Sequence, residues 1–403
     1  MKILQINSVC GVGSTGRIVA DLYNILMEQS HDCTIAFGRE SAPKDIRTIR
    51  IGSNFGNNIH VLKSRLLDRH GFGSVRATRK VINDIDSYNP DIIHLHNIHG
   101  YYINVELLFR YFAKINKPVI WTLHDCWAFT GHCSHFDYIG CEKWKNRCYS
   151  CEQTKNYPKS LFYDNSKMNF NQKKELFTLI DKMHIVTPSN WLANLVKQSF
   201  LSVYPVTVIN NGIDLDVFKP VDSRFRHMHS LNGRIIVLGV ASNWSKKKGF
   251  DAFANLARQL KAPYSVVMVG INENQRKLLP NNVIGIAKTN SAKELAEIYS
   301  AADVFVNPTL EDTFPTVNIE ALACGTPVVT YRTGGSPESI SESCGIVVDK
   351  EDIKSLIKTV ESFNPQQFDK NSIVSHAQQF EKRTKFNKYT KLYNSILSDC
   401  ETH

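Results

Sequence analysis

Two acidic residues in the C-terminal half, Asp312 and Glu320, are spaced so that both can contact one ligand. Asp312 lies in a loop after the apolar run 304–307, and Glu320 follows within a helical stretch that ends at Gly325. In parallel α/β sheets, ligands bind outside the carboxyl ends of the strands, where such loops lie. A carboxylate there accepts hydrogen bonds from a vicinal diol, the group that ribose and hexoses offer. The pair therefore predicts a sugar or nucleotide site.

Cationic and amide groups near this acidic pair suit a diphosphate. Lys248 ends the run Lys246-Lys247-Lys248, and Gly334-Gly335 stand directly before Ser336-Pro337, which has the pattern of a helix start. A diphosphate leaving group gains charge in the transition state, and lysines and helix N-terminal amides stabilise that charge. A solvated loop is the alternative for the lysine run.

A glycine motif, Gly11-Val-Gly13-Ser-Thr-Gly16, follows the first strand candidate. This G-x-G-x-x-G pattern lets the backbone approach a pyrophosphate at a helix N-terminus, as in nicotinamide-dependent oxidoreductases. The acid that such enzymes use for the ribose would have to be Glu40. An NAD-dependent oxidoreductase is therefore an alternative function, although the C-terminal half supplies the better nucleotide site.

His124 and Asp125 end one strand candidate and open a loop, the usual place for active-site residues in this architecture. We expect both on the acceptor side of an active site. A core histidine that is hydrogen-bonded to Asp125 or to a backbone carbonyl is the alternative for His124.

His94 and His96 lie on one face of the neighbouring strand candidate, because side chains alternate along a strand. We expect them to line the acceptor cleft. A metal site shared with His99 and His124 is the alternative, disfavoured because no carboxylate–histidine spacing of a metal catalyst is present.

Five of the ten cysteines lie between Cys126 and Cys151. Four of them form the pattern C-x7-C-x6-C-x2-C in a strandless, lysine-rich insertion, 126–151: Cys133, Cys141, Cys148 and Cys151. Four thiolates suit a tetrahedral structural zinc, with His132 and His135 as reserve ligands. Disulfides are the alternative, and they require an oxidising compartment that nothing else in the sequence supports. We expect no cofactor for catalysis.

Short apolar runs alternate with helical patterns along almost the whole chain. The candidate strands are 3–6, 34–37, 92–96, 119–123, 185–187, 206–209, 235–240, 265–269, 283–286, 304–307, 328–331 and 346–348. Continuous apolar runs are typical of parallel strands covered on both faces. The sequence therefore predicts two doubly wound α/β domains, 1–215 and 216–383, followed by a C-terminal helix, 384–403, that packs back on the first domain.

The chain has 403 residues and a net charge of +10, and no apolar run approaches the length of a membrane-spanning helix. The first residues favour a strand over a signal peptide, so a cytoplasmic location is expected. Between His60 and Lys80, basic residues alternate with leucines at roughly helical spacing, which favours contact with an anionic membrane surface. A solvated helix is the alternative. No nucleic-acid-binding signature is present.

Taken together, these motifs resemble the retaining glycosyltransferases of family 4. The resemblance depends on the acid-x7-Glu segment, Gly334-Gly335 followed by Pro337-Glu338, Asn211-Gly-Ile-Asp214, and Lys248-Gly249. It implies the GT-B fold, in which two Rossmann-like domains face each other across a cleft. It further implies transfer of a sugar from a nucleotide-diphosphate sugar to a glycan. An insertion after the His-Asp pair is similar to that of a subset of bacterial surface-polysaccharide enzymes. Because the basic segment 60–80 would hold the enzyme at the inner leaflet, we expect a lipid-linked acceptor, a glycan or a polyprenyl-diphosphate-linked one.

The resemblance also implies residue roles. Glu320 holds the donor ribose, Asp312 stands where the family usually has a glutamate against the transferred sugar, and His124 faces the donor. Ser242 occupies the position of the family's diphosphate-binding arginine, while Lys248 keeps that of its lysine. The resemblance thus places the donor against these residues, with Glu311 and Lys247 as substitutes and Gly13, Gly334 and Gly335 as further contacts. A nucleotide-sugar-binding protein without catalytic activity is the remaining alternative.

Overall fold

The computed structural model describes residues 1–401, with side chains described through Asp399, and its residues divide into two compact units. Unit 1 comprises Met1–Asn210 and Phe386–His403, and unit 2 comprises Asn211–Lys385. The sequence prediction placed these boundaries after residues 215 and 383. Within the described residues, no helix combines the length and the apolar character needed to cross a bilayer.

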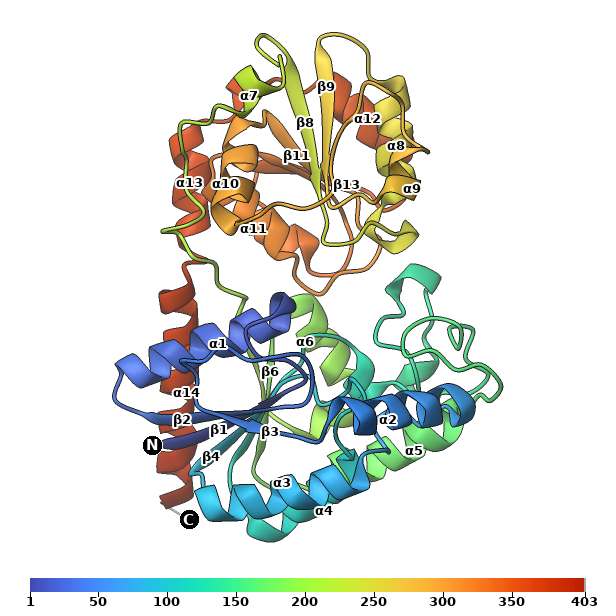
Figure 1. The fold of residues 1–403 in the computed structure, drawn as a ribbon, viewed down its shortest axis with the longest axis vertical. Coiled ribbons are helices and arrows are strands. Elements are labelled where there is room, and N and C mark those ends of the chain that lie inside the picture. Colours follow the sequence, from blue (N-terminus) through green and yellow to red (C-terminus); the bar gives the residue numbers. More distant parts are fainter. Residues whose placement is uncertain (402–403) are drawn as a thin grey trace. The chain divides into compact units, whose positions relative to one another are not determined.

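Unit 1 is built on a seven-stranded parallel sheet in the order β3-β2-β1-β4-β5-β6-β7 (Figure 1). Its strands are β1 (Lys2–Asn7), β2 (Asp32–Phe37), β3 (Thr48–Arg50), β4 (Ile92–Leu95), β5 (Val119–Thr122), β6 (Met183–Thr187) and β7 (Val206–Val208). Its helices are α1 (Gly13–Glu28), α2 (Asn54–Leu67), α3 (Val75–Tyr88), α4 (Val105–Ile115), α5 (Ser166–Phe177), α6 (Asn190–Lys197) and α14 (Lys382–Glu401), the last of which begins in unit 2.

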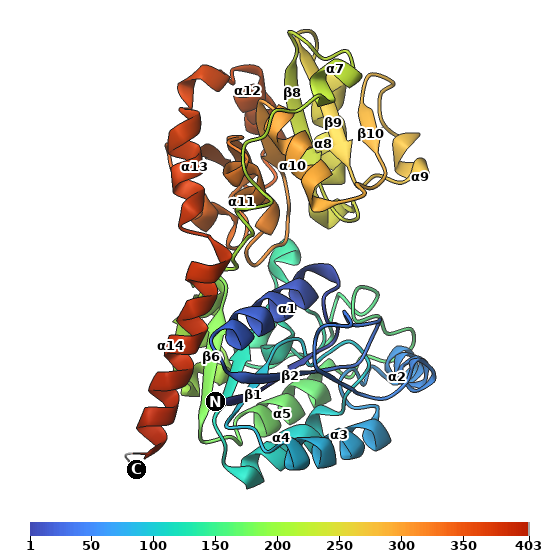
Figure 2. The same cartoon turned by 60° about the vertical axis from the view of Figure 1, so that its left-hand side comes forward.

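Two hydrophobic cores cover the two faces of this sheet, because successive strand side chains point to opposite faces. In β1, Ile3 packs into the core formed with α1 and α14, while Leu4 and Ile6 pack into the core formed with α3, α4, α5 and α6. Figure 2 shows α1 on one side of β1 and β2, and α3 and α4 on the other. Phe386, Tyr389 and Tyr393 belong to the first core. The predicted return of the C-terminal helix to the first domain is therefore confirmed.

Unit 2 has a six-stranded parallel sheet in the order β10-β9-β8-β11-β12-β13. Its strands are β8 (Ile235–Val240), β9 (Tyr264–Val269), β10 (Ile284–Ile286), β11 (Val304–Asn307), β12 (Val328–Tyr331) and β13 (Gly345–Val348). Its helices are α7 (Phe225–Met228), α8 (Phe250–Gln259), α9 (Glu273–Arg276), α10 (Ala292–Ala301), α11 (Thr316–Ala323), α12 (Ile353–Glu361) and α13 (Lys370–Gln378). The predicted pair of doubly wound α/β domains is confirmed.

The basic stretch His60–Lys80 is divided between two helices. It covers the second half of α2 and the first part of α3. Asp68 and Ser74, between the helices, adopt left-handed backbone conformations with φ of 48° and 52°, which end one helix and precede the next. The helical spacing predicted from the sequence therefore applies to α2 and α3 separately.

Candidate functional site

The strand order of unit 2 indicates which edge of its sheet is suited to a ligand. From the central strand β8, the sheet continues through β9 and β10 on one side. On the other side it continues through β11, β12 and β13. The loops after β8 and β11 therefore diverge at a topological switch point, the usual ligand site of such sheets. The first loop carries Ser242 and Lys248, and the second carries Glu311 and Asp312. The predicted donor residues thus lie on the loops that the fold assigns to ligands.

Two ion pairs join these loops. Lys248 Nζ lies 2.7 Å from Asp312 Oδ2, and Lys247 Nζ lies 2.7 Å from Glu311 Oε2. The Glu311 carboxylate is almost fully buried, whereas 18% of the Asp312 side chain remains exposed. Asp312 is thus accessible to a ligand. The ion pair between Glu311 and Lys247 holds the loop after β11 against the lysine run.

Backbone contacts also hold these two loops close together. The Leu310 amide donates to the Lys247 carbonyl at 2.8 Å. A Cβ on Gly249 would come within 2.1 Å of the Pro308 carbonyl oxygen, so only glycine permits this approach. Ser242 lies exposed at the start of the first loop and has no charge to replace the family's arginine.

Glu320 lies in α11 and is buried. Its Oε2 accepts a hydrogen bond from the Tyr299 hydroxyl at 3.2 Å. Burial, and then the Glu320 charge, raise the pKa of Tyr299 well above its usual value, so Tyr299 stays protonated and donates. Nothing in the spacing of Tyr299 signals this role, because it comes from the neighbouring helix α10.

The glycine turn after β12 differs from its prediction. Gly334 has φ of 53°, and a Cβ there would come within 1.7 Å of the Asp312 carbonyl oxygen. The Gly335 amide donates to that same carbonyl at 3.3 Å. The following helix is a single 3-10 turn, Ser336–Ser339. The turn therefore supports the Asp312 loop, and its Gly335 amide is engaged there instead of pointing to a ligand.

In unit 1 the switch point lies between β1 and β4. Gly13 begins α1 with φ of 67°, and apart from its chain neighbours and the adjoining α1 backbone no heavy atom lies within 4 Å of a Cβ built on it. The backbone here is therefore open to a ligand. Glu40, the acid required by the oxidoreductase alternative, is exposed after β2.

His124 is linked to the core by a short chain of hydrogen bonds. Its Nε2 lies 3.1 Å from His96 Nδ1, and His96 Nε2 lies 3.2 Å from Gln5 Oε1. Gln5 Nε2 donates to Val19 O, so Oε1 accepts from His96, and His96 Nδ1 in turn accepts from His124. Burial lowers the pKa of His124 to about 4, with Asp125 opposing the shift. His124 is therefore neutral near pH 7, and His96 orients it.

Asp125 is fixed by two partners. Its Oδ2 lies 2.8 Å from His99 Nε2, and its Oδ1 accepts from the Trp127 amide at 2.9 Å. Burial favours a raised pKa, but the charge and hydrogen bond of His99 outweigh it and hold the pKa of Asp125 at about 2. His99 Nδ1 also lies 3.1 Å from the Tyr157 hydroxyl.

His94 does not have its predicted acceptor-side position. It is fully buried, and its Nε2 lies 2.8 Å from Thr122 Oγ1 while its Nδ1 lies 2.7 Å from the Tyr393 hydroxyl. Because both ring nitrogens have intramolecular partners, His94 anchors α14 against the sheet. Alternation along β4 correctly placed His94 and His96 on one face but did not show that α14 covers it.

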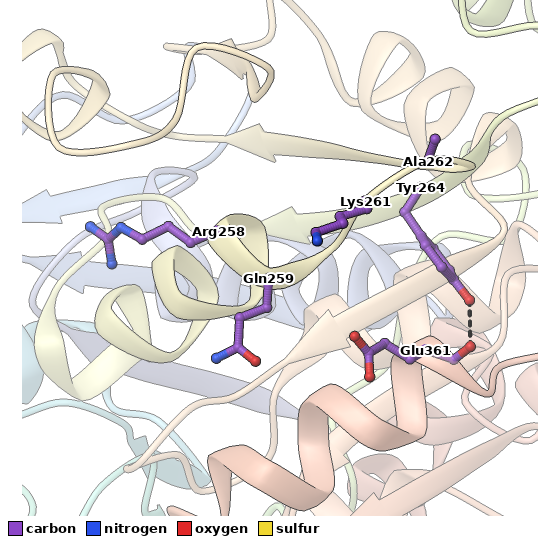
Figure 3. Close-up of a pocket in the computed structure, with 6 residues that line it drawn as sticks. All are labelled: Arg258, Gln259, Lys261, Ala262, Tyr264 and Glu361. Atoms are coloured by element: carbon purple, nitrogen blue, oxygen red, sulfur yellow. Dashed lines mark hydrogen bonds between the residues drawn. The ribbon is translucent and has the colours of Figure 1, made fainter.

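Unit 2 also has a hollow of about 620 Å³, away from the loops described above (Figure 3). Its lining residues are Arg258, Gln259, Lys261, Ala262, Tyr264 and Glu361. They lie at the end of α8, the start of β9 and the end of α12. This is the amino edge of the sheet, opposite to the carboxyl ends, so we assign it no part in donor binding.

Comparisons with known proteins agree with this geometry. A family model described as "Glycosyltransferase Family 4" matches residues 15–217, and one described as "Glycosyl transferases group 1" matches residues 224–391. The chain is 24% identical over 377 residues to WcaC of Escherichia coli (strain K12), a protein named for colanic acid biosynthesis, covering 89% of this chain and 90% of that one.

Solved structures show the same fold. Sucrose-phosphate synthase from Thermosynechococcus elongatus has a TM-score of 0.74 at 17% identity, covering 99% of both chains. Anabaena HepE in complex with UDP has a TM-score of 0.67 at 16% identity, covering 98% of this chain and all of that one. The predicted GT-B fold is confirmed, and the family leaves no support for the oxidoreductase alternative. The chain is a glycosyltransferase and belongs to glycosyltransferase family 4.

Proposed function

We propose that this glycosyltransferase retains the anomeric configuration as it moves a sugar from a nucleotide-diphosphate sugar to a lipid-linked glycan in surface-polysaccharide synthesis. The pairing of Lys248 with Asp312 at the switch point of unit 2 carries the proposal. It places a cation suited to a diphosphate next to a carboxylate suited to sugar hydroxyls. WcaC, named for colanic acid biosynthesis, supports the polysaccharide, and HepE, solved with UDP and with UDP-glucose, supports the donor class.

Each of the three donor residues contacts a different part of the nucleotide-diphosphate sugar. Glu320 accepts hydrogen bonds from the ribose diol, Lys248 neutralises the diphosphate, and Asp312 contacts the transferred sugar. Asp312 is one methylene shorter than glutamate, but its Oδ1 accepts from the Phe314 amide at 3.2 Å, which fixes the carboxylate in place. Donor binding would exchange the Lys248–Asp312 contact for contacts of each residue with the ligand.

The transfer step needs no covalent enzyme intermediate. The acceptor hydroxyl forms a bond to the anomeric carbon on the face from which the diphosphate leaves, and a donor phosphate oxygen takes the hydroxyl proton. Lys248 stabilises the charge that builds on the departing diphosphate. Neutral His124, held by His96, offers hydrogen bonding without adding charge next to the developing oxocarbenium ion.

A lipid-linked acceptor is supported by helix α2, whose burial pattern is inverted. Asn57, His60 and Ser64 face the protein and are buried. Four apolar residues at i, i+4, i+7 and i+11 are instead exposed: Phe55, Ile59, Leu62 and Leu66. An apolar helix face turned to solvent is typical of helices that lie in a membrane interface.

Loop 161–163 extends this apolar face. The Leu161 amide donates to the Arg65 carbonyl at 2.8 Å, which places the loop beside α2, and Phe162 is 73% exposed. Exposed cations lie on α2 and α3: Lys63, Arg65, Arg76, Arg79 and Lys80. Each cation near an anionic leaflet contributes about 1 kcal/mol, so the combination suits the inner face of the cell membrane. We call these apolar and basic residues the α2 surface.

A panel of nucleotide diphosphates and nucleotide sugars tests the proposal by thermal shift. A ligand at 100 times its Kd stabilises the folded chain by about 2.7 kcal/mol, so a selective rise in Tm identifies the base. Turnover with the selected donor, and NMR of the product's anomeric proton, then test transfer and retention. Binding without turnover on lipid-linked acceptors would favour the non-catalytic alternative, and an inverted product would refute retention.

A further inference from the structure

Segment 126–165, between β5 and α5, contains very little regular secondary structure. It contains three single-turn 3-10 helices, η1 (Trp127–Phe129), η2 (Asp137–Ile139) and η3 (Lys143–Lys145). Connections of this length without strands or longer helices are uncommon in compact domains unless they have a function of their own. Side-chain interactions must therefore hold the segment.

One such interaction is a small aromatic core. Trp144 is buried, its ring stacks on Phe136 at a centroid distance of 4.9 Å, and Phe129 lies 5.3 Å from it. Next to this core lies a cavity of about 20 Å³, room for one water-sized sphere. All four cysteines of the predicted set line it: Cys133, Cys141, Cys148 and Cys151.

The thiols already interact with one another and with the backbone. Cys133 and Cys151 form a hydrogen bond through their side chains, although they are 18 residues apart in sequence. Cys148 Sγ accepts a hydrogen bond from the Gly131 amide at 3.2 Å. A Cβ on Gly131 would come within 2.8 Å of the Cys148 Cβ, so glycine permits this approach. Three of the four cysteines that line this one small cavity therefore already have side-chain contacts there.

Two buried polar side chains, Lys173 and His132, lie near the thiols that line the cavity. Lys173 is almost fully buried, and its ammonium donates to the carbonyls of Trp127 and Thr130 at 2.7 and 3.0 Å. The groups whose charges act on this ammonium are the thiols of Cys148 and Cys133 and the carboxylates of Asp125 and Asp68. His132, which also lines the cavity, contacts Asp68 through Nδ1 at 2.5 Å, and its buried Nε2 has no partner among the described atoms.

We propose that Cys133, Cys141, Cys148 and Cys151 bind one structural zinc ion as thiolates. A tetrathiolate zinc centre carries a net charge of about −2, which Lys173 and the cavity-lining Lys143 offset. Among the described residues, no three His, Cys, Asp or Glu side chains already stand as a group that could hold a metal. Binding therefore draws the sulfurs inward to separations of about 3.8 Å, as tetrahedral coordination at about 2.3 Å requires.

The ion would act as a positioning element for the active-site side of unit 1. The segment that it fastens contains Tyr157, whose hydroxyl lies 3.1 Å from His99 Nδ1, and His99 in turn holds Asp125. It also begins directly after His124 and Asp125. Cross-linking positions 133 to 151 therefore limits the conformations open to the loop that carries both residues.

Elemental analysis of the full-length protein, purified without added metal and passed over a chelating resin, tests the site directly. We expect one zinc per chain, and its loss in the double variant Cys133→Ser/Cys151→Ser. Cys126→Ser is the matched control, because Cys126 is buried in the same segment but does not line the cavity. This readout is independent of transferase activity, so its failure and the failure of the proposed function are distinguishable.

Measurements on the unaltered protein cover the case in which a variant fails to fold. Titration with a mercurial should release the zinc in step with modification of four thiols, and cobalt(II) substitution should give a thiolate-to-metal charge-transfer band. A wild-type protein without bound zinc overturns the proposal, as does a Cys133–Cys151 disulfide in a non-reduced peptide map. Loss of zinc in His132→Ala together with its retention in Cys141→Ser would overturn the ligand set.

Discussion

Lys248 and Asp312 face each other at 2.7 Å between their Nζ and Oδ2 atoms, across the two loops that diverge at the switch point of the unit 2 sheet. They are 64 residues apart in sequence, and only the parallel packing of β8 beside β11 brings them together. The two halves of the proposed donor site, a cation suited to a diphosphate and a carboxylate suited to sugar hydroxyls, are thus already adjacent in the protein.

Replacing Lys248 with methionine should lower kcat far more than it lowers stability. Removing one group that stabilises developing charge costs about 100-fold to 1,000-fold in kcat. The lysine is half-exposed, and an ion pair of this kind contributes about 1 kcal/mol or less to folding. Release of nucleoside diphosphate under saturating donor measures the first effect, and urea unfolding measures the second. Lys246→Met, in the same lysine run, is the control, and an equal loss of activity there would contradict a specific role for Lys248.

Glu320→Gln should weaken donor binding by roughly 10-fold to 100-fold, because a hydrogen bond to a charged acceptor is worth about 1.5 to 3 kcal/mol. The effect should appear with the nucleoside diphosphate alone, since the proposed contact is to ribose. Isothermal titration calorimetry gives the Kd directly. Glu297→Gln, an exposed position on the neighbouring helix α10, should leave the Kd unchanged. Unaltered binding in Glu320→Gln would remove the ribose assignment.

Gly334→Ala tests whether the glycine turn supports the Asp312 loop. The new Cβ would meet the Asp312 carbonyl oxygen, so either the turn or the loop has to move. We expect a loss of about 1 to 3 kcal/mol in the free energy of unfolding, together with weaker donor binding. Gly233→Ala is the matched control, because Gly233 also has positive φ, at 72°, but nothing lies within 4 Å of its Cβ position. Equal behaviour of the two variants would show that backbone strain alone explains the loss.

His94 should make the folded chain sensitive to acid. Burial, and then the charge of His124, lower the pKa of His94 to about 3, below the 6.5 or so of an unfolded chain. The unfolded state therefore binds a proton first, and stability falls as the pH drops from about 6.5 towards 3, by up to roughly 5 kcal/mol. Urea unfolding at several pH values should show a shallower slope in His94→Gln than in the wild type. The exposed His227→Gln should keep the wild-type slope.

The sequence predicted where Asp312 and Lys248 lie, because the positions of their loops follow from strand order. Once Asp312 and Lys248 are placed directly after parallel strands, the fold brings them to one edge of the sheet. Strand β3 escaped prediction because its three residues, Thr48, Ile49 and Arg50, contain a single apolar side chain and lie at the sheet edge.

The sequence predictions were wrong or incomplete where segments distant in the sequence determine which side chains are buried. His94 was placed on the correct face of its strand, but Tyr393, 299 residues away, covers that face. Tyr299 reaches Glu320 from a different helix, so no local spacing reveals it. In α2, charge patterning suggested a membrane surface, but only the structure shows that Asn57 points inward, where its Nδ2 donates to the Gly38 carbonyl at 2.7 Å.

The α2 surface should bind anionic vesicles through its apolar face and its cations together. Co-sedimentation with phosphatidylglycerol vesicles should exceed that with phosphatidylcholine vesicles, and it should weaken as salt is raised, because salt screens the attraction of the basic residues. Phe55→Ser/Leu62→Ser removes two exposed apolar side chains and should reduce binding to the anionic vesicles by roughly 100-fold or more, at about 1.5 kcal/mol or more per side chain. Leu278→Ser, an exposed leucine in unit 2, is the matched control. Equal binding of the control and the double variant would show that the α2 surface is not the membrane contact, and no preference for anionic lipid would show that its cations play no part.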